Sequence, residues 1–169
     1  MRTLRVVFSH GKDSGPAGSK IRAMSERVRD LGHRSASIDY RGMDDPGARV
    51  EKLVRYCHDA EEPLVLVGSS MGGHVAATAA ERVSAAGLFV LAPAFYIAGY
   101  EELTPPPPDL PVTIVHGWQD DVVPVDNSIR YARQCAAALH VLDDGHRLTA
   151  SIDTINLLLE HFLERIAAA

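Results

Sequence analysis

The chain of 169 residues is 46% hydrophobic and 23% charged, which predicts one globular domain over residues 1–169 and argues against intrinsic disorder. Its net charge of −5 comes from 17 basic and 22 acidic side chains. Because general nucleic-acid and anionic-membrane binders rely on basic surfaces, this balance argues against both classes of partner.

Short apolar runs alternate with segments of helical periodicity along the whole chain. The strands that these runs predict cover residues 4–8, 34–39, 64–67, 88–91, 112–115 and 139–142. Apolar residues three and four positions apart predict helices over residues 21–31, 46–57, 71–82, 126–137 and 151–166. Gly32 stands where a C-terminal cap glycine belongs, and Asp45-Pro46 is typical of an N-cap followed by a first-turn proline.

This alternation of strands and helices predicts an α/β fold. Runs without polar alternation, such as Leu64 to Val67, are typical of strands that are buried on both faces. We therefore expect a three-layer α/β/α domain with a six-stranded, mainly parallel sheet in the order 2-1-3-4-5-6 and no cap domain. The one irregular stretch, residues 92–111, contains prolines from Pro105 to Pro108, which favour a stiff connector.

The cysteine content and the apolar runs predict a cytoplasmic protein. Cys57 and Cys135 stand far apart and form no CxxC pair, so we expect two reduced thiols and no metal site. No secretory signal is visible after Met1. The most apolar stretch, from Gly87 to Tyr100, is too short to span a bilayer, and no membrane partner is expected.

The segment Gly68-Ser69-Ser70-Met71-Gly72 has the form G-x-S-x-G. It follows a buried strand and precedes a helix of small residues, which is the context of a nucleophile elbow. In such an elbow the serine occupies a tight, strained turn that exposes its hydroxyl at the carboxyl edge of the sheet. The glycines two positions away allow the backbone to pack closely. Ser70 is therefore the candidate nucleophile.

A nucleophilic serine needs a base, and the base needs an acid to orient it. On a fold of this kind the three residues follow in the order serine, acid, histidine. Asp120 lies in the loop after the fifth strand, and His146 lies in the loop after the sixth. Both loops lie at the same sheet edge as Ser70. Asp121 and Asp126 are alternatives for the acid.

The other strand-end histidines have a simpler interpretation. His10 and His116 also end strands, but we expect them to form hydrogen bonds within loops, and His74 to pack as an ordinary helix residue. The Lys12 N–H, reached through Gly11 in the loop after the first strand, is the expected second oxyanion donor.

The first oxyanion donor is expected to be the N–H of Met71, the residue after the nucleophile. The same Gly11-Lys12 segment lacks the spacing of a phosphate-binding loop, so no nucleotide is expected. In the expected strand order, strand 2 is added on one side of strand 1 and strands 3 to 6 on the other. Ligands of open α/β sheets bind at such a switch point, which here lies between strands 1 and 3. The loops after these two strands carry the proposed nucleophile and both oxyanion donors.

Together these segments resemble the α/β-hydrolase family over nearly the whole chain. The resemblance rests on the motifs His10-Gly11, Asp39 to Gly42, Gly68 to Gly72, His116 to Pro124 and Gly145-His146. Small, lidless bacterial members, described as esterases or thioesterases, are the most similar. The family's two leading antiparallel strands and its cap domain have no counterpart here. A serine at position 70 disfavours the dienelactone hydrolases, which carry cysteine there.

The resemblance and the motifs together imply a serine hydrolase that cleaves a small carboxylic ester or thioester without cofactor or metal. A non-enzymatic binding protein on a hydrolase scaffold, or an amidase or peptidase of the same fold, are the alternatives. The aromatic residues between positions 95 and 100 either line a short acyl pocket or cover the edge of the sheet. The residues that we name as candidates for a substrate pocket come from three loops. They are Gly11, Phe95, Tyr96, Tyr100 and Trp118.

Overall fold

A computed structural model describes residues 1–169, and its centre is a single six-stranded sheet. The strands are β1 (Arg5–Ser9), β2 (Arg34–Ile38), β3 (Leu64–Ser69), β4 (Gly87–Leu91), β5 (Val112–Gly117) and β6 (Ala138–Leu142). Their order across the sheet is β2-β1-β3-β4-β5-β6, and every neighbouring pair is parallel. The predicted fold class and strand order are therefore confirmed.

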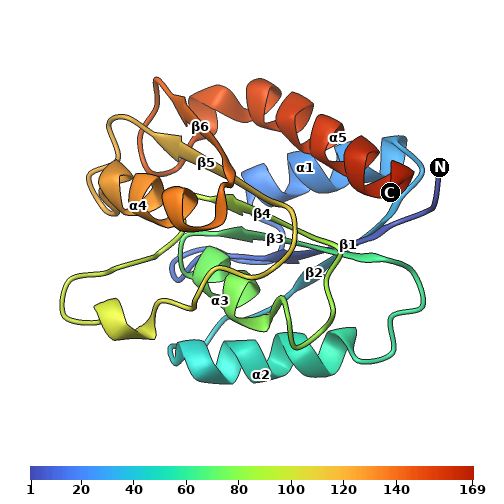
Figure 1. Cartoon of the computed structure of the whole chain (residues 1–169), viewed down its shortest axis with the longest axis horizontal. Helices are drawn as coiled ribbons and strands as arrows, with labels where there is room; N and C mark the ends of the chain where they lie inside the picture. The colour runs from blue at the N-terminus through green and yellow to red at the C-terminus, as the bar shows by residue number, and fades with distance from the viewer.

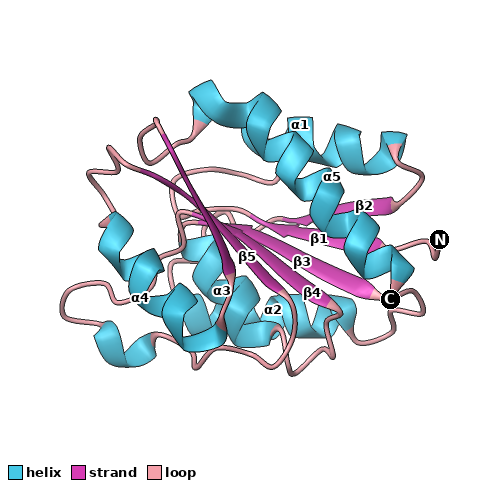
Figure 2. Ribbon diagram, turned by 45° about the horizontal axis from the view of Figure 1, so that its top comes forward, coloured by secondary structure: helices cyan, strands magenta, loops and turns pink.

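Helices cover both faces of this sheet and complete the three layers (Figures 1 and 2). The helices are α1 (Ser19–Asp30), α2 (Pro46–Cys57), α3 (Met71–Ala79), α4 (Val125–Cys135) and α5 (Ile152–Ala168). Helices α1 and α5 lie side by side on one face, and α2, α3 and α4 lie on the other (Figure 1). No helix combines the length and apolar character that crossing a membrane requires.

Each face of the sheet has its own apolar core. Alternate strand residues point to opposite faces, so Val7 and Leu66 pack toward α2 and α3, whereas Val6 and Val65 pack toward α1 and α5. All four of these side chains are fully buried. A strand with both faces covered needs apolar residues at every position, which explains the unbroken apolar runs of the sequence.

Local signals set several helix ends as the sequence predicts. The Asp45 carboxylate accepts a hydrogen bond from the N–H of Ala48 at 2.7 Å, which caps α2 at its N-terminus. Gly32 follows α1 with a φ of +82°, a left-handed conformation that glycine adopts without steric cost.

One helix is shorter than the periodicity predicts. Helix α3 ends at Ala79 instead of continuing to Arg82. The next residues form tight turns, in which the N–H of Ser84 donates to the carbonyl of Glu81 and Ser84 takes a φ of +51°. The reversal is needed because β4 must begin beside β3 only a few residues later.

The connection between β4 and β5 contains no cap domain. Its only regular element is a 3₁₀ helix, Glu101–Leu103. A second 3₁₀ helix, Thr149–Ser151, precedes α5. The loops that leave the strands at their carboxyl ends are therefore not covered by an additional layer of structure.

Candidate active site

Ser70 lies at the turn between β3 and α3, in a conformation that is rare for a residue with a side chain. Its backbone angles are φ +55° and ψ −119°. Its N–H donates to the carbonyl of Leu91 at 2.9 Å, and its own carbonyl accepts from the N–H of Ala94 at 2.9 Å. These bonds to the β4 strand and the loop after it hold the strained turn in place.

Glycines allow this turn to form because other backbone atoms occupy the space of a side chain. A Cβ atom on Gly68 would lie 2.2 Å from the carbonyl oxygen of Gly72. A Cβ atom on Gly72 would lie 2.0 Å from the carbonyl oxygen of Ser9 on β1. The helix therefore starts directly against the central strands, and the Ser70 hydroxyl stands at the carboxyl edge of the sheet.

The structure brings Ser70, His146 and Asp120 into one hydrogen-bonded chain. His146 Nδ1 lies 2.8 Å from Asp120 Oδ2, and His146 Nε2 lies 3.0 Å from Ser70 Oγ. Because the carboxylate can only accept, Nδ1 carries the proton, and Nε2 is left to accept from the serine hydroxyl. The His146 side chain is 19% exposed, so it can meet a substrate or water, whereas the Asp120 side chain is fully buried.

Four N–H groups surround the buried Asp120 carboxylate. The backbone N–H groups of Val122 and Val123 donate to Oδ1 at 2.9 and 2.7 Å. Oδ2 lies 2.8 Å from His146 Nδ1 and 3.1 Å from His116 Nε2. Burial alone would raise the pKa of Asp120, but the hydrogen bonds from His146 and the two backbone N–H groups hold it below its ordinary value. The acid is therefore ionised at neutral pH.

His116 contributes one of these donors and is itself fully buried. Its Nε2 lies 2.9 Å from the carbonyl oxygen of Val123, which can only accept, so Nε2 carries a proton. Its Nδ1 lies 2.7 Å from the Ser128 hydroxyl, which can donate to it. Burial lowers the pKa of His116, so the ring stays neutral. The loop hydrogen bonds expected for His116 are present, and one of its contacts reaches the acid.

The loops that carry the acid and the histidine are joined to each other. The N–H of Gln119 donates to the carbonyl of Asp144 at 3.0 Å. Gly117 makes this contact possible, because a Cβ atom there would lie 2.2 Å from the same carbonyl oxygen. Asp121 and Asp126, the alternatives for the acid, are both exposed. Of the three acids, Asp120 is the one in contact with His146.

A serine, a histidine and a buried carboxylate at the carboxyl ends of β3, β6 and β5 agree with the sequence comparison. The family whose description is alpha/beta hydrolase domain matches residues 2–168. The chain belongs to the alpha/beta hydrolase family. No curated protein matches it significantly.

Solved structures of alpha/beta hydrolases superimpose on nearly the whole chain. A protein from Xanthomonas campestris described as a hydrolase of the alpha/beta superfamily is 29% identical, with a TM-score of 0.86, over 97% of this chain and 99% of that one. A lidless serine hydrolase, also from Xanthomonas campestris, is 18% identical, with a TM-score of 0.82, over 99% and 84%. Est1E from Butyrivibrio proteoclasticus is 19% identical, with a TM-score of 0.84, over 99% and 89%.

The two expected oxyanion donors of this alpha/beta hydrolase belong to segments that lie next to the serine. The N–H of Met71 is the first of α3, and the first N–H groups of a helix have no partner within it. Gly11 in the loop after β1 approaches Ser70 closely, since a Cβ atom on Gly11 would lie 3.5 Å from Ser70 Cβ. The next N–H, that of Lys12, donates to no protein acceptor.

The aromatic residues expected in the substrate pocket divide into two groups. Phe95 is fully buried and stacks on Tyr131 at a centroid distance of 4.0 Å, so its ring offers no surface to a ligand. The Tyr96 ring packs under Arg130, and its hydroxyl accepts from Gln134 at 2.6 Å, which directs it to α4. The apolar character of these residues serves the core and the α4 contact. Tyr100 and Trp118 are exposed, at 62% and 57%.

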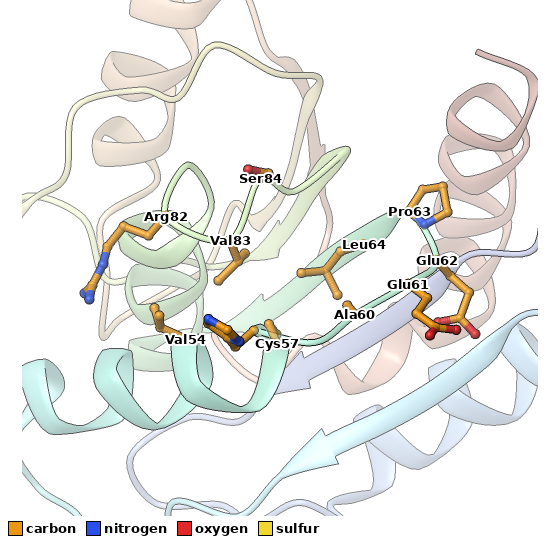
Figure 3. A pocket seen from close by; sticks show the side chains of 11 residues that line it. Val54, Cys57, Ala60, Glu61, Glu62, Pro63, Leu64, Arg82, Val83 and Ser84 are labelled. Carbon is orange, nitrogen blue, oxygen red and sulfur yellow. The ribbon is translucent and has the colours of Figure 1, made fainter.

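A separate pocket has no triad residue in its lining, and Figure 3 shows the side chains that form it. Its volume is about 480 Å³, and residues from the end of α2, the start of β3 and the turn after α3 line it. Pro63 and Leu64 belong to its wall, which places it at the amino ends of the strands. Ser70 lies at the opposite edge, so this pocket takes no part in chemistry at the serine.

Proposed function

We propose that the protein is a serine hydrolase that cleaves a small carboxylic ester or thioester through an acyl-enzyme on Ser70. The single observation that supports this proposal most is the continuous chain from the Ser70 hydroxyl through His146 to Asp120, with separations of 3.0 and 2.8 Å. A hydroxyl with a hydrogen-bonded imidazole is activated for attack as the proton moves to Nε2. We propose a cytoplasmic location for this activity.

In the first half of the reaction, Ser70 Oγ attacks the acyl carbon while its proton passes to His146 Nε2. Asp120 stabilises the imidazolium that forms. The N–H groups of Met71 and Lys12 donate to the oxyanion of the tetrahedral intermediate. The bond to the leaving alcohol or thiol then breaks, and the leaving group takes the proton from Nε2.

In the second half, a water molecule gives its proton to Nε2 and attacks the acyl-enzyme. Collapse of the second intermediate releases the carboxylic acid and returns the proton to Ser70. Water can reach the acyl-enzyme because no cap domain covers the site. The same openness favours small or extended substrates over those that need an enclosing lid.

A fluorophosphonate probe tests the nucleophile directly. Two serines stand side by side, so Ser69→Ala is a matched control for Ser70→Ala. We expect the probe to label the wild-type protein and Ser69→Ala but not Ser70→Ala, as measured by intact-protein mass spectrometry. Absence of labelling in folded wild-type protein would contradict the proposal and favour a binding protein on a hydrolase scaffold. Labelling that persists in Ser70→Ala would contradict the assignment of Ser70 as the nucleophile.

A substrate series then decides among esters, thioesters and amides. We propose Lys12, whose side chain is exposed beside the serine loop, as a contact for an anionic group such as a carrier phosphate. Rates with p-nitrophenyl esters, acyl-CoA and anilides of equal acyl length give the preference. If the contact exists, Lys12→Ala should slow acyl-CoA hydrolysis more than ester hydrolysis. Equal effects on both substrates would remove the argument for a thioester, and dominant anilide cleavage would assign an amidase.

Substitution of Asp120 and of its neighbour Asp121, one at a time, tests which of the two is the catalytic acid. Asp120→Asn is expected to lower kcat about 10³- to 10⁴-fold, because a neutral amide neither stabilises the imidazolium nor holds the correct tautomer of His146. Asp121→Asn, on an exposed carboxylate, should stay within about twofold, as expected for a surface substitution. Steady-state kinetics with p-nitrophenyl acetate measure both. Similar losses in the two variants would contradict the assignment of Asp120.

A further inference from the structure

A buried arginine that the mechanism above does not use lies behind the oxyanion loop. Arg49 on α2 is 1% exposed. Burial of a charged group is expensive, and buried guanidinium groups usually pair with carboxylates. None of the ion pairs of the structure includes Arg49. The Arg49 guanidinium is therefore buried without an ionic partner to offset its desolvation. This cost points to a functional role for the neutral groups that it contacts.

The partners of Arg49 are backbone carbonyls, and two of them belong to the loop after β1. Its Nη1 lies 3.2 Å from the oxygen of His10 and 3.3 Å from the oxygen of Gly11. Its Nε donates to the oxygen of Met43 at 2.8 Å, and its guanidinium lies over the Tyr40 ring at 5.1 Å. The Arg49 guanidinium of α2 thus donates to two consecutive carbonyls of the loop after β1.

His10 holds the same Gly11 carbonyl from a second direction. The N–H of Tyr40 donates to His10 Nε2 at 2.8 Å, so this nitrogen carries no proton. The proton is therefore on Nδ1, which donates to the Gly11 oxygen at 2.7 Å. The His10 ring is fully buried, and burial lowers its pKa, which keeps it in this neutral form. The Gly11 oxygen therefore accepts from His10 and from Arg49.

Fixing this carbonyl also fixes the next N–H. The Gly11 carbonyl and the Lys12 N–H belong to one planar peptide group, and in a trans peptide they point in opposite directions. With the carbonyl turned inward to His10 and Arg49, the Lys12 N–H is turned away from them and makes no bond within the protein. Gly11 has no side chain to hinder rotation of this peptide, so the orientation depends on its hydrogen bonds.

We propose that Arg49 is a positioning residue of the oxyanion hole: it holds the Gly11 carbonyl and thereby aims the Lys12 N–H at the developing oxyanion of Ser70. This inference rests on the proposed function. It predicts that Arg49 affects the transition state without affecting substrate binding in the ground state, because the Lys12 N–H donates fully only to the oxyanion.

Arg49→Gln is the principal variant, since glutamine keeps a polar side chain but cannot reach both loop carbonyls with a charged group. Loss of one oxyanion donor costs about 10²- to 10³-fold in kcat, and His10 still holds the carbonyl in this variant, so we expect a decrease of about 10- to 100-fold. KM should change by less than about threefold, as expected when an interaction made only in the transition state is lost. Arg49→Lys should recover part of the activity.

The readout must separate positioning from stability. Titration with the fluorophosphonate counts active sites, so kcat is expressed per reactive serine. A trifluoromethyl ketone, which forms an oxyanion on Ser70, should lose affinity by the same factor as kcat. Arg55→Gln is the matched control, because Arg55 lies on the same helix α2 but is exposed, and its side chain makes no contact with the loop after β1. It should keep kcat and ketone affinity within about twofold.

The kcat per site, the ketone affinity and the melting temperature of the Arg49 variants together distinguish a positioning role from a purely structural one. Wild-type kcat per site and ketone affinity in Arg49→Gln, with only a lower melting temperature, would overturn the inference and make Arg49 a stability residue. If Arg49→Gln does not fold, Arg49→Lys decides by the same two measurements, and failure of both variants to fold also overturns it. Wild-type protein that neither reacts with the probe nor hydrolyses any ester overturns the proposed function itself, whereas an active wild type with unaffected Arg49 variants overturns this inference alone.

Discussion

Ser70→Ala is expected to lower kcat for p-nitrophenyl acetate about 10⁴- to 10⁶-fold while the protein remains folded. The hydroxyl is the atom that forms the acyl-enzyme, and neither His146 nor the oxyanion donors can replace it. The substitution removes one oxygen from a half-buried side chain and keeps the Cβ atom, so the fold should tolerate it. Steady-state kinetics and circular dichroism measure the two effects.

Ser70→Gly adds a stability test of the same turn. Ser70 combines φ +55° with ψ −119°, a sparsely populated conformation that costs a residue with a side chain about 1–3 kcal/mol and glycine very little. Glycine also loses more chain entropy on folding, by about 0.5–1 kcal/mol. We therefore expect Ser70→Gly to be about 0.5–2 kcal/mol more stable than Ser70→Ala in urea unfolding, with both variants inactive. An alanine variant more stable than the glycine variant would contradict the strained elbow, and near-wild-type turnover in either would remove Ser70 as the nucleophile.

Gly72→Ala is expected to destabilise the fold by about 3 kcal/mol or more, at the upper end for an overpacked site. The new Cβ atom would lie 2.0 Å from the oxygen of Ser9 and 2.6 Å from the oxygen of His10. Both are backbone atoms at the end of the central strand β1, which cannot move without disturbing the sheet. Helix propensity alone predicts the opposite sign, because alanine is favoured over glycine by about 1 kcal/mol inside a helix.

Gly18→Ala is the control for this prediction. Gly18 caps α1 with a φ of −56°, which alanine adopts without strain, and its added Cβ atom would lie at an ordinary 3.5 Å from the Gly15 oxygen. Its stability should stay within about 1 kcal/mol of wild type. Thermal and urea unfolding compare the two variants. A Gly72→Ala protein as stable as Gly18→Ala would show that the elbow does not pack against β1 as described.

Much of the fold followed from local patterns because burial imposes them directly. A parallel sheet covered on both faces requires unbroken apolar strands, and the run at residues 64–67 predicted β3 inside its observed bounds of Leu64–Ser69. Cap residues such as Asp45 act within one turn of chain, so they too could be recognised in the sequence. The end of α3 at Ala79 could not, because the need to enter β4 beside β3 set it, and the residues themselves would have continued the helix.

The roles of the aromatic residues in the β4–β5 connection were also beyond local patterns. For Phe95 and Tyr96 the sequence left two roles open, lining an acyl pocket or covering the edge of the sheet. In the structure Phe95 stacks on Tyr131, and the Tyr96 hydroxyl accepts from Gln134, both residues of α4 more than 35 positions further along the chain. An apolar side chain satisfies a core and a ligand pocket equally well, so only the position of the partner helix distinguishes the two.

The sequence by itself determined the fold class, the strand order, and Ser70 and His146 as candidate nucleophile and base, with Asp120 as the first of three candidate acids. It could do so because strand–helix alternation and the G-x-S-x-G turn constrain the backbone locally, and parallel strands bring their carboxyl ends to one edge. Only the tertiary structure decided which acid meets the histidine and which buried groups, Arg49 and His116, hold the reactive loops. Those contacts join residues far apart in the chain, and hydrogen-bond distances of about 3 Å are fixed by packing across the whole domain.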